Sequence, residues 1–149
     1  VFVGISFGET VALTVVYSDE RMKAIVSVVG LNSIFGNFDR NPRNWKERLT
    51  LAYLRFRGVK TKALTHEDNK IMSPKYALQK DNPQLNQRVF LANVKNDTCI
   101  AFEEFEKNQK ILQLPPEQTL VLEKGGHGAL HQEIILLARI SQFLHSKLT

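Results

Sequence analysis

The sequence predicts an α/β protein in which a parallel sheet carries helices on both faces. The segment Ala24–Val29 is almost wholly apolar and rich in β-branched residues, as expected of a parallel strand buried on both sides. From Arg88 onward, strand-like and helix-like segments alternate, which is typical of βαβ units. With 149 residues, 43% hydrophobic and 23% charged, the chain is long and apolar enough for one packed domain.

Each element follows from its local pattern of apolar residues. Strands are expected where short apolar runs end at glycine or at polar turns, namely at Val1–Gly4, Ala24–Val29, Arg88–Val94 and Thr119–Glu123. Helices are expected where apolar residues recur at helical spacing, namely at Phe7–Ser18, Trp45–Phe56, Glu103–Gln113 and Ala129–Leu148. The chain contains no internal repeat and no low-complexity segment.

Residues 31–87 contain no comparable strand and are too long for a plain connection. They include a polar loop at Asn37–Asn44, the expected helix at Trp45–Phe56 and a further segment at Ile71–Leu78. Aromatic residues are expected to form the core of this insertion: Phe35, Phe38, Trp45, Tyr53 and Phe56. Basic residues gather in the same region and are interpreted as a solvated face: Arg40, Arg43, Lys46, Arg48, Arg55, Arg57, Lys60 and Lys62.

Ser6 stands at the centre of the sequence Gly4-Ile5-Ser6-Phe7-Gly8, between an expected strand and an expected helix. A turn that sharp crowds the backbone, and glycines on both sides of the serine leave room because they have no Cβ. The serine is then presented at the head of a helix, where backbone N–H groups can receive an oxyanion. The motif predicts a nucleophile, and a chance G-x-S-x-G sequence is the alternative.

A serine nucleophile needs a base, and His127 is the best candidate among four histidines. It lies in the glycine-rich loop Lys124–Gly128, directly after the last expected strand. His66 sits in a polar, charged stretch and is interpreted as solvated, while His131 is placed in the start of the last helix and His145 near its end. Although His127 and His131 are four apart, no third ligand cluster accompanies them, so no metal site is expected.

The base in turn needs an acid that orients it, and Asp97 fits this role. It lies in the polar turn Lys95–Thr98, directly after the expected strand Arg88–Val94. The carboxyl ends of parallel strands meet at one edge of a sheet, so Asp97 is expected at the edge that carries Ser6 and His127. The alternative is that Asp97 only shapes the turn, as Asp often does.

Taken together, these motifs resemble the C-terminal half of an α/β-hydrolase, and the resemblance covers essentially the whole chain. GISFG resembles the nucleophile elbow, VFLANVKNDT the strand and turn of the acid, and LVLEKGGHG the histidine loop, in the family's order. The resemblance implies a serine hydrolase that cleaves a carboxylic ester or related acyl bond of a small molecule or lipid. Ser6 would be the nucleophile, His127 the base, Asp97 the acid, and the N–H of Phe7 an oxyanion donor. No cofactor and no metal are implied.

The resemblance also implies a domain organisation: hydrolase core at 1–30 and 88–149, with a cap or lid inserted at 31–87. Several strands precede the elbow strand in the family. The N-terminal strands and the second oxyanion donor are therefore expected to be missing here, and to come from the same polypeptide or from another chain. Without them the elbow strand, which belongs near the middle of the complete sheet, is expected to leave apolar surface open to aggregation or pairing.

One position departs from the family. Many relatives carry a second glycine directly after the elbow, where this chain has Glu9. Its carboxylate either opposes formation of an oxyanion or points to solvent. Glu9 and the missing strands keep an alternative open, namely a non-catalytic α/β-hydrolase-like binding protein or an inactive fragment.

Charge and composition restrict the partners. The net charge of +5 and the pI of about 9.4 allow attraction to anionic surfaces, but no nucleic-acid motif accompanies the basic residues, so no nucleic-acid partner is expected. No apolar run reaches the roughly 18 residues of a membrane span. Cys99 is the one cysteine, which excludes an intrachain disulfide here. It is interpreted as a small buried hydrophobe and slightly favours a cytoplasmic setting.

Overall fold

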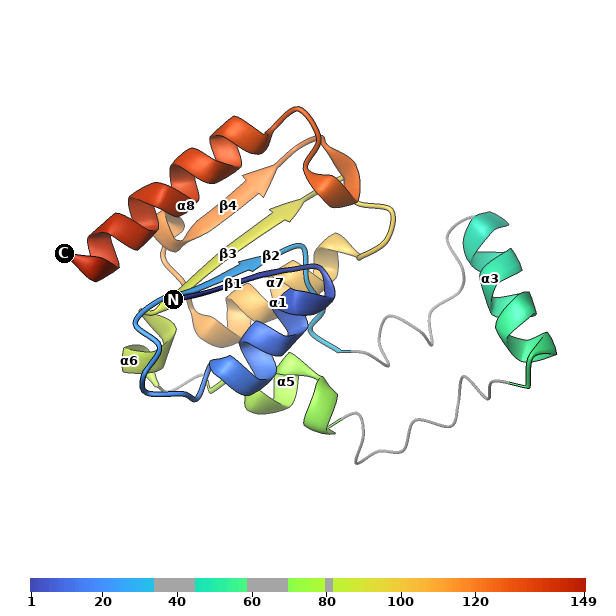
Figure 1. Cartoon of the computed structure of the whole chain (residues 1–149), viewed down its shortest axis with the longest axis horizontal. Helices are drawn as coiled ribbons and strands as arrows, with labels where there is room; N and C mark the ends of the chain where they lie inside the picture. Colours follow the sequence, from blue (N-terminus) through green and yellow to red (C-terminus); the bar gives the residue numbers. More distant parts are fainter. Residues whose placement is uncertain (34–44, 59–69, 80–81) are drawn as a thin grey trace.

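A computed structural model of the chain describes residues 1–33, 45–58, 70–79 and 82–149. Its centre is a parallel sheet of four strands in the spatial order β1-β2-β3-β4 (Figure 1). The strands are β1 (Phe2–Ile5), β2 (Ile25–Val28), β3 (Val89–Val94) and β4 (Thr119–Leu122). All three pairings are parallel, so the α/β class and the expected strands are confirmed, each within about one residue of its predicted bounds.

The register explains why the two inner strands are the most apolar. Phe2 pairs with Ile25, Ile25 with Val89, and Leu91 with Thr119. Every residue of β2 and of β3 is buried, because each of these strands has a neighbour on both sides and helices above and below. At the edge of the described sheet, β1 leaves Val3 49% and Ile5 58% exposed. The carboxyl ends of all four strands lie at the same edge of the sheet.

Alternate side chains of the inner strands enter two separate cores. Phe90, Ala92 and Val94 pack with Ile140 and Phe143 of helix α8 (Glu133–Leu148). Val89 and Leu91 point the other way and pack with residues of η1 (Ala12–Val16), the π-helix that continues α1 (Phe7–Val11), and of α7 (Phe102–Leu112). Figure 1 shows α8 on one side of the sheet, with α1 and α7 on the other. Helices on both faces are therefore confirmed.

The predicted ends of two helices are wrong. The predicted helix Phe7–Ser18 changes to π geometry at Ala12, where the hydrogen-bonding pattern widens. The predicted helix Ala129–Leu148 begins only at Glu133, because Ala129 and His131 have φ values of +51° and +64°, outside the helical region. His131 therefore precedes the last helix and does not lie within its start.

The insertion at 31–87 is described in part. Helix α3 has the predicted bounds, Trp45–Phe56, and stands away from the sheet in Figure 1. Its side chains Trp45 and Tyr53 are exposed, and Phe56 is 88% exposed, so the prediction that these aromatic residues form a core is wrong. Two shorter helices follow, α5 (Pro74–Ala77) and α6 (Pro83–Asn86). The role of residues 31–87 as a cap stays a prediction.

Several predicted features lie outside the described residues. They are the polar loop Asn37–Asn44, the histidine His66, the aromatic residues Phe35 and Phe38, and the basic residues Arg40, Arg43, Lys60 and Lys62. Arg48 and Arg57 are exposed, as expected of a solvated face. Within the described ranges, none of the helices combines the length and the apolar character that a membrane crossing requires.

Candidate active site

Ser6 lies in the single-residue turn between β1 and α1. Its backbone has φ +56° and ψ −119°, a conformation that residues other than glycine rarely adopt and that costs about 1–3 kcal/mol. The turn is held because the N–H of Ser6 donates to the carbonyl of Val28 on β2 (2.9 Å) and its own carbonyl accepts from Glu9 N–H (3.1 Å). A strained, half-buried serine between a strand and a helix is the arrangement that the G-x-S-x-G motif predicts.

The two glycines of the motif have different roles. A Cβ at Gly4 would lie 2.2 Å from the carbonyl oxygen of Gly8 and 2.7 Å from the nitrogen of Glu9, so only glycine lets α1 pack this closely on β1. A Cβ at Gly8 would meet nothing within 4 Å. The prediction that both glycines make room for the turn is therefore correct for Gly4 and wrong for Gly8.

Asp97 follows β3 and divides its two carboxylate oxygens between two tasks. Oδ1 accepts the backbone N–H of Cys99 (2.7 Å) and of Ile100 (3.1 Å), which fixes the turn. Oδ2 lies 2.8 Å from Nδ1 of His127. Asp97 therefore both shapes the turn and faces the histidine. Its side chain is buried.

His127 lies in a short 3₁₀ turn, η3 (Gly126–Gly128), between β4 and α8. Gly125 has a φ of +135°, and a Cβ there would come within 2.9 Å of the backbone of Ala129, so the loop needs glycine at this point. The N–H of Gly126 donates to Oδ1 of Asn96 (2.9 Å). The histidine loop is thus tied to the turn that carries Asp97, which holds the two side chains together.

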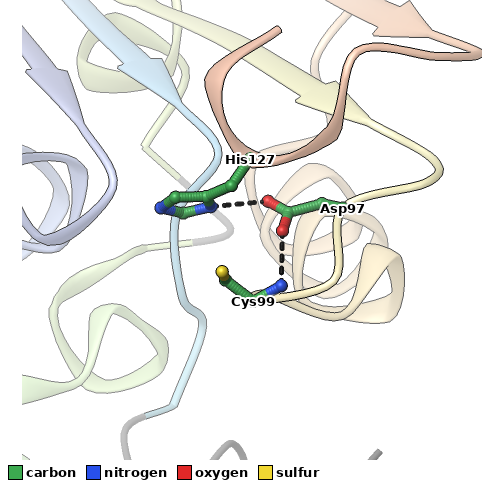
Figure 2. Close-up of side chains that lie close together, drawn as sticks. All are labelled: Asp97, Cys99 and His127. Carbon is green, nitrogen blue, oxygen red and sulfur yellow. Dashed lines mark hydrogen bonds and ion pairs between the residues drawn. The ribbon is translucent and has the colours of Figure 1, made fainter. Parts of the chain in front are cut away.

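The structure brings the three predicted site residues together. Nε2 of His127 lies 2.8 Å from Oγ of Ser6, while Nδ1 lies 2.8 Å from Oδ2 of Asp97; Figure 2 shows the imidazole and the carboxylate. A carboxylate has no proton to donate, so Nδ1 carries the hydrogen and Nε2 is left to accept from the serine hydroxyl. The other described histidines, His131 and His145, are exposed and take no part in this chain.

Glu9 corrects the expectation for the position after the elbow. Its carboxylate does not point to solvent, since the residue is only 1% exposed. Oε1 accepts a hydrogen bond from the Ser27 hydroxyl (2.5 Å), and Oε2 lies against Gly30 with no hydrogen-bond partner among the described residues. Burial raises the pKa of Glu9 to about 8; the Ser27 hydroxyl and the backbone of Leu31 oppose this rise, and Glu104 adds to it.

A second buried carboxylate, Glu104 on α7, was missed by the sequence analysis. Its Oε2 accepts the backbone N–H groups of Asn32 and Ser33, both at 3.0 Å, and Oε1 pairs with Lys107. Glu104 and Leu112 lie eight residues apart on the buried face of α7, with Asn108 between them. This spacing places Glu104 on the apolar side of the helix and could have identified it. Its contacts fasten the chain that leaves β2.

Cys99 also departs from expectation. The thiol-bearing residue is exposed, so the prediction of a small buried hydrophobe is wrong. The cause is the Asp97 turn, because the hydrogen bonds to Oδ1 fold the backbone of Cys99 and Ile100 back over the carboxylate and bury Ile100 instead. Figure 2 shows the sulfur of Cys99 turned toward the His127 ring.

Comparison with known proteins gives structural matches alone. No protein-family model matches the sequence, and no curated protein sequence matches it. Among solved structures, the acylaminoacyl peptidase of Pyrococcus horikoshii is similar over 99% of this chain, at 14% identity and a TM-score of 0.64. An esterase of Pyrococcus furiosus is similar over 99% of the chain, at 13% identity and a TM-score of 0.54.

A third similar structure is a meta-cleavage product hydrolase of Pseudomonas fluorescens, with 97% of this chain covered, 13% identity and a TM-score of 0.51. The chain spans 24% of the acylaminoacyl peptidase, 53% of the esterase and 64% of the meta-cleavage product hydrolase. At these identities the matches concern the fold. The three matches cover 97–99% of this chain.

Proposed function

Because the chain has the α/β-hydrolase fold, we propose that it forms the catalytic part of a serine hydrolase that cleaves a carboxylic ester or related acyl bond. One observation carries this proposal: an unbroken hydrogen-bonded chain from Ser6 through His127 to Asp97, with both links at 2.8 Å. Three residues from separate loops rarely reach this order and geometry unless the site uses them together.

The arrangement supports acyl transfer through an acyl-enzyme. Nε2 of His127 takes the proton of the Ser6 hydroxyl as Oγ attacks the carbonyl carbon, and then gives that proton to the leaving group. Asp97 keeps the imidazole oriented and stabilises its cationic form through Nδ1. Water then attacks the acyl-serine: His127 takes a proton from the water and gives it back to Oγ of Ser6. The residues of this chain suffice for the proton transfers, and the proposal involves no cofactor.

The backbone N–H of Phe7 is the proposed oxyanion donor. Phe7 is the first residue of α1, so no carbonyl within the helix can accept from its N–H. The donor directly follows the nucleophile, which places it beside the carbonyl oxygen of a substrate attached to Ser6. Burial raises the pKa of Glu9 to about 8, so below this pH its carboxyl is mostly uncharged and does not oppose the oxyanion. The binding-protein alternative therefore loses the support that it took from Glu9.

Further strands are proposed to pair with β1, from the same polypeptide or from another chain. The support is the outer side of β1, which is an edge in the described sheet and exposes Val3 and Ile5. Substrate selection is assigned to residues 31–87 as a cap and to these further strands. A small-molecule or lipid ester is the proposed substrate; the three site residues leave open both the acyl group and the kind of acyl bond.

The test is covalent labelling of the full chain with a fluorophosphonate probe, followed by mapping of the modified peptide. Labelling at Ser6 is expected, and Ser6→Ala should abolish it while the circular dichroism spectrum stays unchanged. Ser141→Ala is the matched control, because Ser141 is an exposed serine on α8, outside the site, and should keep full labelling. Labelling that survives in Ser6→Ala, or that never reaches Ser6, would overturn the proposal.

A further inference from the structure

Cys99 adds a third metal-binding side chain to the acid–histidine pair. Among the described residues, Asp97, Cys99 and His127 form a group whose ligand atoms all lie within 4.8 Å of one another. A carboxylate, a thiol and an imidazole together are the donor types that zinc and similar cations prefer. In Figure 2 the Asp97 carboxylate lies at one edge of the imidazole ring, and the sulfur of Cys99 lies below the ring.

The group is held in place by the backbone. The hydrogen bond from Cys99 N–H to Oδ1 of Asp97 (2.7 Å) fixes the position of the cysteine relative to the carboxylate. The bond from Gly126 N–H to Asn96 fixes the histidine loop on the same turn. Oδ1 is occupied by these turn contacts, so Oδ2, which faces His127, is the oxygen available to a cation. The exposure of Cys99 gives a cation access from solvent.

We propose that a thiophilic divalent cation of the zinc type binds Oδ2 of Asp97, Sγ of Cys99 and Nδ1 of His127, replacing the hydrogen that joins the acid to the histidine. Ligands of a tetrahedral zinc ion lie roughly 3.3 to 3.8 Å apart, given bond lengths of about 2.0 to 2.3 Å. The 2.8 Å contact between Asp97 and His127 must therefore lengthen slightly. The sulfur of Cys99 lies within 4.8 Å of the other two ligand atoms, and a rotation of its side chain can bring it to coordination distance.

Proton accounting shows what the cation changes. The thiol of Cys99 loses its proton to solvent when the sulfur binds the cation. The imidazole stays neutral, but its hydrogen moves from Nδ1 to Nε2, because Nδ1 now binds the cation. The bound state holds one cation of charge +2 against the carboxylate and the thiolate, so the site is neutral overall. Water completes the coordination.

The moved hydrogen has a functional consequence, which rests on the proposed function. With a hydrogen on Nε2, His127 can no longer accept the proton of the Ser6 hydroxyl, which lies 2.8 Å away. The cation therefore inhibits the site without touching the nucleophile. Binding of the cation itself does not depend on any hydrolytic activity.

Cobalt(II) tests the binding directly, since a cobalt–thiolate bond gives an intense near-ultraviolet charge-transfer band. The full chain titrated with Co²⁺ is expected to develop this band, and excess Zn²⁺ should remove it. Cys99→Ser should abolish the band and weaken Co²⁺ binding more than about 100-fold, because loss of even an outer partner of a ligand costs about 10–100-fold. Mg²⁺, which prefers oxygen ligands, should not compete.

His145→Ala is the matched control for the imidazole ligand, because His145 is an exposed histidine in the last turn of α8. It should keep the cobalt band, whereas His127→Ala should lose it. A band that survives in Cys99→Ser, that disappears in His145→Ala, or that never forms in the wild-type chain would overturn the proposed metal site.

Fluorophosphonate labelling separates the metal site from the proposed function. Zinc-loaded chain is expected to label at Ser6 at least about tenfold more slowly than chain treated with a chelator, as follows from loss of a general base. Equal labelling rates at saturating zinc would overturn the blocking of Nε2. If metal-free chain does not label at all, the proposed hydrolase function fails, while the cobalt band still decides whether the cation binds.

Discussion

Replacing Glu9 by glutamine should stabilise the folded chain at neutral pH. Glu9 is fully buried beside Ser27 and Gly30, and its pKa is raised to about 8, chiefly by burial. Glutamine has nearly the same shape, carries no charge at any pH, and keeps an oxygen that can accept from the Ser27 hydroxyl. The variant therefore removes the titration and leaves the packing in place.

The direction and size of the effect follow from proton linkage. The unfolded Glu9 carboxyl releases its proton near pH 4.5, whereas the folded one keeps it until about pH 8. Between these values the folded state binds the extra proton, so stability falls as the pH rises through this window. A solution at about pH 7 lies about 2.5 pH units above the pKa of the unfolded carboxyl. Each unit lowers the free energy of unfolding by about 1.4 kcal/mol, so the total loss is on the order of 3 kcal/mol. Glu9→Gln should recover this amount.

Urea denaturation at several pH values measures the effect. The difference in unfolding free energy between Glu9→Gln and wild type should be smallest near pH 4.5 and should grow to about 3 kcal/mol at about pH 7. Glu106→Gln is the control, because Glu106 is an exposed glutamate on α7, and the same substitution there leaves the buried carboxyl of Glu9 in place. If the difference between Glu9→Gln and wild type did not change with pH, Glu9 would be charged in the folded state and the linkage argument would be refuted.

Three further predictions concern the elbow, a buried hydroxyl and the acid. Gly4→Ala should lower the unfolding free energy by about 1–3 kcal/mol in urea, because its Cβ would overlap the backbone of Gly8; an unchanged value would contradict the close packing of α1 on β1. Tyr17→Phe should lower it by about 1 kcal/mol in thermal denaturation, since the Tyr17 hydroxyl donates to Oδ1 of Asn86 (2.6 Å); no change would show that this bond contributes nothing. Asp97→Asn should reduce kcat for a p-nitrophenyl ester by a factor on the order of 10⁴, less than Ser6→Ala, and full activity would exclude Asp97 as the orienting acid.

The parts of the fold that could be predicted are those with a strong local signal. A strand such as Ile25–Val28, buried on both faces, must be apolar at every position or nearly so, and this pattern survives in the sequence without knowledge of its neighbours. The loops of Ser6, Asp97 and His127 were found because each follows a short apolar run that predicts a strand. Parallel strands bring their carboxyl ends together, so the position along the chain translates into a position in space.

The failures concern side chains whose environment is set by distant residues. Whether Glu9 points outward depends on Ser27 and Gly30, which reach it only when α1 packs against β2. Exposure of Cys99 depends on the direction that the Asp97 turn gives to the backbone. The late start of α8 depends on positive φ at Ala129 and His131, a conformation that residues other than glycine rarely adopt.

The proposed metal ligands also lack a local signal in the sequence. The four-residue spacing of His127 and His131 suggested a metal pair, because such spacing on a helix can hold a cation. The third ligand type came instead from Cys99, on the loop after a different strand. Ligands from two loops have no characteristic spacing, so only the register of the strands brings them together.

The wide separation of the site residues along the chain has a consequence for folding. The contact between Ser6 and His127 closes a loop of 121 residues and requires β1, β2, β3 and β4 to be paired in their final order. A slip of one residue in any strand would turn its side chains to the opposite face and carry its loop out of reach. Because closing such a loop is entropically costly, the triad is expected to form late, after the sheet that supports it. Under the proposed function, the reactivity of Ser6 therefore measures completed folding: during refolding, only a molecule with all four strands in register brings the Ser6 hydroxyl to Nε2 of His127.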